Sequence, residues 1–151
     1  MDEFLMQFID LGPALVLALP AIGSAIGAGT AGMAAIGAWK KNYSQNKPAL
    51  FLLVAFVGAP LTQTIYGMII MNRIAVLAAQ GHFLWSMGAL CGAALGLSAY
   101  FQGRCAAVAC DAMGETGQGF GNYMIVLGMV ETVALLVMAF TLGVLGSFAT
   151  A

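Results

Sequence analysis

The stretch Tyr123-Met-Ile-Val-Leu-Gly-Met-Val-Glu131-Thr-Val-Ala-Leu-Leu-Val-Met-Ala-Phe140 decides how this chain folds. It is apolar over nearly the length that a helix needs to cross a bilayer, about 20 residues, and the sequence stays apolar beyond it. Its single carboxylate is Glu131, and a charge at mid-membrane depth costs about 3 kcal/mol even on lenient scales. We therefore expect Glu131 to bind or carry a cation. The alternative is a protonated structural acid that only hydrogen-bonds a neighbouring helix.

The composition of the whole chain is that of a multi-span membrane protein. Of its 151 residues, 62% are hydrophobic and 7% are charged, and the mean hydropathy is +0.96. These values lie outside the range of soluble domains. A net charge of −1 with five Lys and Arg leaves no basic surface for nucleic acid. The three cysteines lack CxxC spacing, so we expect them to pack as small apolar side chains.

Four apolar segments predict four transmembrane helices. Each has about 28 residues, or roughly 42 Å of helix, which exceeds a bilayer core of about 30 Å. The connections between them are short, so successive helices should be antiparallel. The predicted fold is an all-α membrane protein with helices over Leu11–Trp39, Ala49–Leu77, Phe83–Asp111 and Asn122–Ala149.

The two halves of the chain look like copies of one helical hairpin. A shift of 71 residues aligns Gly32 with Gly103, and a shift of 70 aligns Leu61 with Glu131. Such an internal repeat indicates a duplicated two-helix unit, in which only the second copy keeps its acid. We predict one membrane domain over residues 1–151, made of hairpins over 1–80 and 81–151.

Basic residues predict the orientation in the membrane. Lys40, Lys41 and Lys47 lie in the first connection and Arg104 lies towards the third, whereas Arg73 is near the second. Because Lys and Arg are enriched in cytoplasmic loops, the first and third connections should be cytoplasmic and both termini non-cytoplasmic. The acidic N-terminus lacks the basic start of a signal peptide, so the first span should be retained. These features are compatible with a bacterial plasma membrane.

Small residues in the first and third segments predict close helix packing. Helices in lipid associate through close backbone approach at small residues, as in the GxxxG motif. We therefore expect the first and third helices to form an inner layer, with the bulkier second and fourth helices outside it. The predicted packing glycines are Gly23, Gly27, Gly29, Gly32 and Gly103.

Uncharged oxygen donors at membrane depth predict the rest of the ion site. Pro60 has no N–H, so a carbonyl one turn earlier loses its helical partner, and Thr62 and Gln63 follow directly. Gln102 comes from the third segment and Glu131 from the fourth. Oxygen ligands with one negative charge suit a monovalent cation better than Ca²⁺ or Mg²⁺, which recruit more carboxylates. The alternative is that these residues only hydrogen-bond the helices together.

These motifs resemble the membrane rotor proteolipid of V-type ATPases, over essentially the whole chain. The resemblance implies a ring of identical copies with no catalytic site of its own. It also implies a stator subunit that supplies an arginine, and central-stalk subunits at the cytoplasmic loops. The segments that carry the resemblance are residues 23–32, Pro60-Leu-Thr-Gln63 with Tyr66-Gly67, Gln102-Gly103 and Met129-Val-Glu131-Thr132.

The resemblance to sodium-binding members of that family implies a full set of Na⁺ ligands in this chain, together with a tyrosine that hydrogen-bonds the glutamate. The resemblance therefore favours Na⁺, one ion on each copy. Two alternatives remain, the same ring carrying H⁺ and a small secondary transporter with Glu131 as its coupling acid. A purely structural bundle would leave the polar residues unexplained. The implied ligands are the backbone carbonyl of Ala59 and the side chains of Thr62, Gln63, Gln102 and Glu131, with Tyr66 as the hydrogen-bonding tyrosine.

Overall fold

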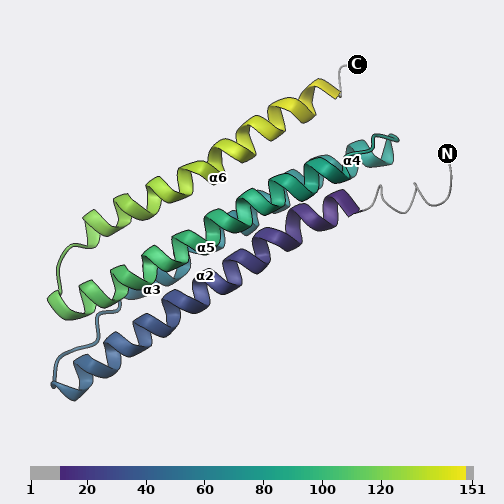
Figure 1. The fold of residues 1–151 in the computed structure, drawn as a ribbon. Coiled ribbons are helices and arrows are strands. Elements are labelled where there is room, and N and C mark those ends of the chain that lie inside the picture. Colours follow the sequence, from purple (N-terminus) through teal and green to yellow (C-terminus); the bar gives the residue numbers. More distant parts are fainter. Residues whose placement is uncertain (1–10, 149–151) are drawn as a thin grey trace.

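The computed structural model describes residues 11–148, which form a bundle of long helices lying side by side (Figure 1). No strand occurs among these residues, and the predicted all-α pair of hairpins is confirmed. The segments α3, η1 and α4 follow one another without a gap and together make the second long segment. The helices are α2 (Leu11–Ser44), α3 (Leu53–Gly58), the 3₁₀ turn η1 (Ala59–Leu61), α4 (Thr62–Ala79), α5 (Trp85–Thr116) and α6 (Phe120–Phe148).

Two helices end five residues later than the sequence predicted. Helix α2 ends at Ser44, not Trp39, and its last turn contains Lys41, a cation that the negative end of the helix dipole favours. Helix α5 ends at Thr116, beyond the predicted Asp111. Polar residues therefore extend these helices past the apolar stretch instead of ending them.

A glycine ends α5. Gly117 has φ of 69°, in the left-handed region that glycine adopts without strain, and its N–H bonds the carbonyl of Met113. The second long segment begins at Leu53, four residues after the predicted Ala49. Ala149, the predicted end of the last helix, lies outside the described residues.

Three of the four long segments are apolar enough to cross a membrane by length and composition. They are Leu11–Ser44, Leu53–Ala79 and Phe120–Phe148. Helix α5 is long enough, with 32 residues, but Gln102 and Arg104 near its middle lower its hydropathy. It packs against both α2 and α6, so much of its surface is covered by protein (Figure 1).

The closest packing in the bundle joins α2 to α5. A Cβ atom at Gly23 would lie 2.1 Å from the carbonyl oxygen of Gly96, and one at Gly103 would lie 2.1 Å from the Cα of Gly27. Only glycine permits these approaches, because no side-chain atom could be accommodated there. Helices α4 and α6 lie outside this pair, α4 against both of its helices and α6 mainly against α5.

Two of the predicted packing glycines lie outside this contact between α2 and α5. A Cβ at Gly29 would meet no atom within 4 Å, and one at Gly32 would meet only Val57, at 3.7 Å. Helical geometry explains the difference, since a step of two residues turns about 200° around the axis and places Gly29 on the face opposite Gly27. The sequence pattern located the small residues but not the face to which each belongs.

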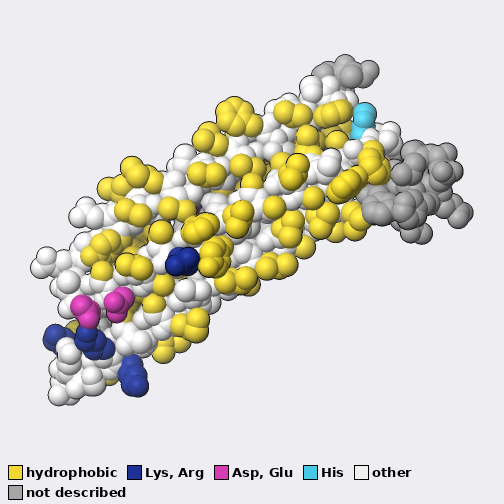
Figure 2. All heavy atoms as spheres, in the orientation of Figure 1, with side chains coloured by type: hydrophobic (Ala, Val, Ile, Leu, Met, Phe, Trp, Pro, Cys, Tyr) yellow, Lys and Arg dark blue, Asp and Glu magenta, His cyan; other side chains and the backbone are white. Residues whose placement is uncertain are grey.

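On the face shown in Figure 2, most of the charged side chains gather at one end of the bundle, where α2 leads into α3 and α5 leads into α6. Lys41 forms an ion pair there with Glu115, which links the last turns of α2 and α5. At the other end, where α2 begins and α6 ends, the His82 ring lies against Phe148 with 5.5 Å between ring centroids. Most of the surface between the two ends is hydrophobic (Figure 2).

Replacing a glycine by alanine should affect stability differently inside the α2–α5 contact and outside it. We expect Gly103→Ala to destabilise the bundle by about 1–3 kcal/mol, because α5 must move away from α2. The matched control Gly37→Ala, at a site with no atom within 4 Å of a new Cβ, should be neutral or stabilising by up to about 1 kcal/mol through helix propensity. Thermal unfolding in detergent, followed by circular dichroism, measures both. Equal losses of stability in the two variants would contradict the close packing of α2 on α5 at Gly103.

Candidate ion-binding site

The site begins where the second long segment changes its helical form. Helix α3 ends at Gly58, and α4 starts at Thr62 after the 3₁₀ turn that contains Pro60. Since proline cannot donate a backbone hydrogen bond, the regular α-helical pattern is interrupted here. The carbonyl of Ala59 accepts from the backbone N–H of Thr62 and, at 3.1 Å, from its hydroxyl. The break therefore places a backbone oxygen beside a hydroxyl oxygen.

Two buried glutamine side chains connect this turn to α5. Gln63 is fully buried and Gln102 is 1% exposed. Nε2 of Gln63 donates to Oε1 of Gln102 at 2.7 Å, and the hydroxyl of Thr62 donates to Oε1 of Gln63 at 3.2 Å. Because buried amides require partners, this chain of bonds fixes the direction of each amide oxygen.

Glu131 of α6 completes the cluster. The hydroxyl of Tyr66 donates to one carboxylate oxygen at 2.6 Å, and Nε2 of Gln102 donates to the other at 3.3 Å. The half-buried carboxylate is thus held between α4 and α5, and its charge is directed towards polar partners instead of lipid.

The structure brings together every side chain and carbonyl that the sequence proposed as a ligand. Four elements contribute, namely η1, α4, α5 and α6, and one carboxylate lies among uncharged oxygens. No group of three or more His, Cys, Asp or Glu side chains occurs among residues 11–148. Such a cluster can hold a proton or a single monovalent cation. Its members are Ala59, Thr62, Gln63, Tyr66, Gln102 and Glu131.

Thr132 does not join the cluster although it follows Glu131 directly. Its hydroxyl donates to the carbonyl of Gly128 in its own helix at 2.9 Å, and its side chain is exposed. Successive residues of a helix point about 100° apart, so the neighbour of a site residue faces elsewhere.

Sequence reasoning missed several positioning contacts. The carbonyl of Leu127 accepts from Nε2 of Gln102 at 3.0 Å, and the hydroxyls of Ser24 and Thr64 bond at 2.9 Å between α2 and α4. A backbone carbonyl leaves no trace in residue identity, so Leu127 could not have been found. The hydroxyl pair had a weak signal, two small polar side chains within apolar helices.

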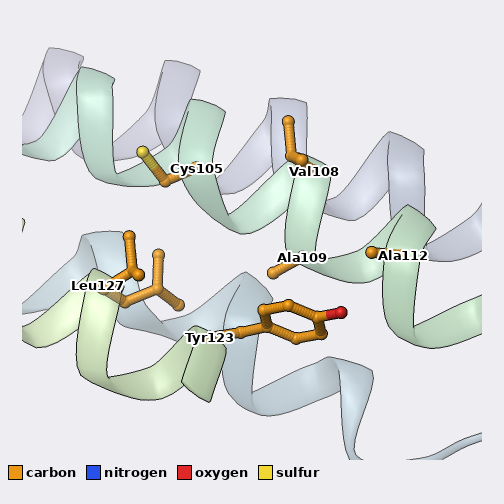
Figure 3. A pocket seen from close by; sticks show the side chains of 7 residues that line it. Cys105, Val108, Ala109, Ala112, Tyr123 and Leu127 are labelled. Atoms are coloured by element: carbon orange, nitrogen blue, oxygen red, sulfur yellow. The ribbon is translucent and has the colours of Figure 1, made fainter. Parts of the chain in front are cut away.

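A separate apolar pocket lies between α5 and α6 (Figure 3). The ring of Tyr123 lies across from Ala109 and Ala112, and Leu127 is the one lining residue whose carbonyl also contacts the ion cluster. The lining side chains are apolar except for the Tyr123 hydroxyl and the Cys105 thiol, so the pocket offers no ligand set for a cation. The lining residues are Cys105, Val108, Ala109, Ala112, Tyr123, Val126 and Leu127.

Paired helical hairpins with one carboxylate among uncharged oxygens define a class of membrane ion carriers. The family model for the C subunit of ATP synthase matches the chain twice, over residues 11–72 and 85–143. The chain belongs to this ATP synthase family. No curated protein matches the chain significantly. The two matches coincide with the two hairpins, so the predicted duplication is confirmed.

Membership of this family establishes the general role of the chain. It is a non-catalytic integral membrane subunit of the ion-translocating rotor of an ATP synthase. Members of this family form a ring of identical copies that works with a stator subunit. The expectation of a membrane rotor subunit is confirmed at this level.

The buried amide pair should behave as one unit in a double-mutant cycle. Gln63→Leu alone removes the donor to Gln102 and should cost about 1–3 kcal/mol, because a buried oxygen loses its partner. Gln63→Leu with Gln102→Leu should cost less than the sum of the two single losses, by at least about 0.5 kcal/mol. Thermal unfolding in detergent measures the loss of stability in each single variant and in the double variant, with Thr132→Val as the exposed control. Simple additivity would show that the bond at 2.7 Å contributes nothing.

Proposed function

We propose that this chain is the sodium-carrying rotor proteolipid of a V-type rotary ATPase, with one Na⁺ on Glu131 of each copy. The observation that carries the proposal is the number of oxygens that hydrogen bonds link into one cluster with a single carboxylate. A protonated acid needs one hydrogen-bond partner, and Tyr66 already supplies it at 2.6 Å. A proton site would use the remaining oxygens, from Ala59, Thr62 and Gln63, only for contacts within and between helices, whereas Na⁺ needs them to replace its water shell.

The charge balance of the site supports the same conclusion. A rotor subunit must carry its carboxylate past lipid, and a bare charge there costs about 3 kcal/mol or more. One Na⁺ bound to the ionised Glu131 gives a site with no net charge, since the other ligands are neutral. A divalent ion would leave an uncompensated positive charge, so the single carboxylate also sets the valence of the cargo.

The V-type assignment rests on the distribution of acids between the hairpins. Both hairpins match the same family model, yet the position in the first hairpin that corresponds to Glu131 is Leu61, which is 51% exposed. One ion per four helices, instead of one per two, is the pattern that the resemblance to V-type proteolipids implies.

Partners and orientation follow from the two ends of the bundle. Lys40, Lys41 and Lys47 lie at the end where Lys41 pairs with Glu115, and the excess of positive residues favours the cytoplasmic side. Central-stalk subunits would bind this end, and both termini would lie on the other side of a bacterial plasma membrane. A stator arginine would meet Glu131 at mid-membrane and displace the ion.

The alternative cargo is H⁺, and one contact favours it. The Tyr66–Glu131 hydrogen bond would equally hold a protonated carboxyl that accepts from the tyrosine. In that case Thr62, Gln63 and Gln102 would serve only to join α4, α5 and α6.

Replacing Glu131 by its neutral isostere tests the role of the carboxylate. Glu131→Gln should abolish ion transport, because the amide can neither be protonated nor neutralise a cation. The ring should still assemble, since the side chain keeps its shape and its bond from Tyr66. Ion uptake by reconstituted vesicles and native mass measure the two properties, with Thr132→Val as the control that retains transport. Normal transport by Glu131→Gln would refute the proposal.

A further inference from the structure

We propose that Arg104 and Tyr100 of α5 bind the phosphate of a phospholipid with a net negative charge. The proposal does not depend on the cargo ion, because it requires only that the chain lies in a membrane. Arg104 is exposed and follows Gln102 by two residues, a step that turns about 200° around the helix axis. Its side chain therefore leaves α5 on the face opposite the ion cluster, which does not use it.

The guanidinium of Arg104 has no counter-ion within residues 11–148. Arginine is not deprotonated in proteins, so this positive charge is permanent. Glu131 belongs to the ion cluster and Glu115 pairs with Lys41. The third carboxylate in this part of the chain, Asp111, lies seven residues, or about 10 Å, further along α5. The structure therefore leaves one positive charge of α5 unpaired.

The position of Arg104 along α5 places it inside the hydrocarbon layer. Helix α5 has 32 residues and is about 48 Å long, so a bilayer core of about 30 Å centred on it leaves about 9 Å outside at each end. Arg104 is about 18 Å from the nearer end at Thr116, and thus about 9 Å below the surface of the core. A cation at that depth draws polar groups inwards and thins the bilayer locally.

The direction of the side chain means that the anion must come to the arginine. The guanidinium carbon of Arg104 lies 5.9 Å from the ring centroid of Tyr100. Tyr100 is one turn closer to the start of α5, so the side chain is directed away from the nearer end of the helix. The ring of Phe101 packs edge-on against that of Tyr100, with 5.2 Å between centroids, and holds the tyrosine in place.

The site offers hydrogen-bond donors that no group of the described chain uses. Within residues 11–148, neither the N–H groups of Arg104 nor the hydroxyl of Tyr100 forms a hydrogen bond. A guanidinium can donate two parallel hydrogen bonds to the oxygens of one phosphate. Arg104 and Tyr100 together thus present a positive group, rich in donors, to an anion.

Exposed apolar side chains beside the cation favour a lipid over a free anion. Arg104 lines a hollow with Phe101, Cys105 and Val108, and Phe101 is 51% and Val108 69% exposed. An inorganic anion would leave this apolar surface uncovered, whereas the acyl chains of a lipid would contact it. Asp111 is too distant to pair with a positively charged head group at the same phosphate. A lipid with net negative charge therefore fits better than phosphatidylcholine.

The internal repeat shows that the fold does not need a cation at this position. A shift of 71 residues places Arg104 on Met33 of the first hairpin, which is apolar and 70% exposed. The same shift places Tyr100 on Gly29, which has no ring. Since both hairpins match one family model, methionine serves this position as well as arginine does. The arginine therefore has a role of its own, at one site in each chain.

Lipid binding by the full-length chain in detergent tests this inference. Native mass counts the phosphatidylglycerol molecules bound to each chain as that lipid is titrated. Arg104→Met should weaken the binding by about tenfold, because charge-assisted hydrogen bonds to the phosphate are lost. This variant should fold, since Met33 occupies the counterpart position. The matched control Arg73→Met removes one cation from α4, six residues from the end of that helix, and should bind the lipid as the wild type does.

Two further variants keep the test decisive if Arg104→Met fails to fold, which circular dichroism reports. Tyr100→Phe keeps the ring under the guanidinium but removes the hydroxyl, and should weaken lipid binding by about threefold. Arg104→Lys keeps the charge but not the paired donors, and should bind the lipid more weakly than the wild type. Wild-type affinity in both variants would contradict the assignment of these two side chains.

Three other results would overturn the inference. The first is equal binding of phosphatidylglycerol by Arg104→Met and the wild type, or equal binding of phosphatidylglycerol and phosphatidylcholine by the wild type. The second is displacement of the lipid by inorganic phosphate, which would identify a site for the free anion. The third is loss of another protein subunit from the purified complex of Arg104→Met with its lipid retained, which would assign the arginine to a protein partner.

Sodium binding separates this inference from the proposed function. Protection of Glu131 by sodium should be the same in Arg104→Met and in the wild type, because the two side chains lie on opposite faces of α5. Loss of lipid binding with normal sodium protection supports the inference and leaves the proposed function intact. Failure of sodium protection in the wild type would overturn the proposed cargo without affecting the lipid site.

Discussion

The cost of holding the Glu131 charge inside an apolar bundle is the constraint on which the rest of the structure depends. A carboxylate at this depth must have hydrogen-bond donors and a cation or proton. Both of its oxygens accept hydrogen bonds, from Tyr66 and Gln102. These donors come from two other helices, so α4, α5 and α6 must keep a fixed register along the bundle. The fold can be understood as the arrangement that satisfies this requirement.

Close packing of α2 on α5 stabilises that arrangement. Gly27 and Gly103 let the two backbones meet, and Gln102 directly precedes this contact, so its amide is held against Gln63 and Leu127. The turn at Pro60 then supplies the Ala59 carbonyl beside the hydroxyl of Thr62. Packing, helix break and charge thus act on a single cluster, and a change in any of them should affect ion binding.

Much of this could be predicted from the sequence, for identifiable physical reasons. Hydropathy located the helices, a lone acid located the centre of the site, and Pro60 marked the break. The helix ends were missed because polar residues such as Lys41 extended them. The roles of Gly29 and Gly32 were missed because composition does not specify a helix face. The contribution of Leu127 was invisible because a backbone oxygen belongs to every residue.

Carbodiimide labelling of Glu131 in the purified ring tests the central claim most directly, because the reagent modifies the protonated carboxyl. Labelling is followed over pH with and without sodium, in the wild-type chain and in Gln63→Ala. Bound Na⁺ excludes the proton, so millimolar sodium should suppress labelling and displace its pH profile to lower pH. Gln63→Ala should need more sodium for the same protection. Labelling that follows pH alone, with no effect of sodium, would contradict the account and identify a proton-carrying ring.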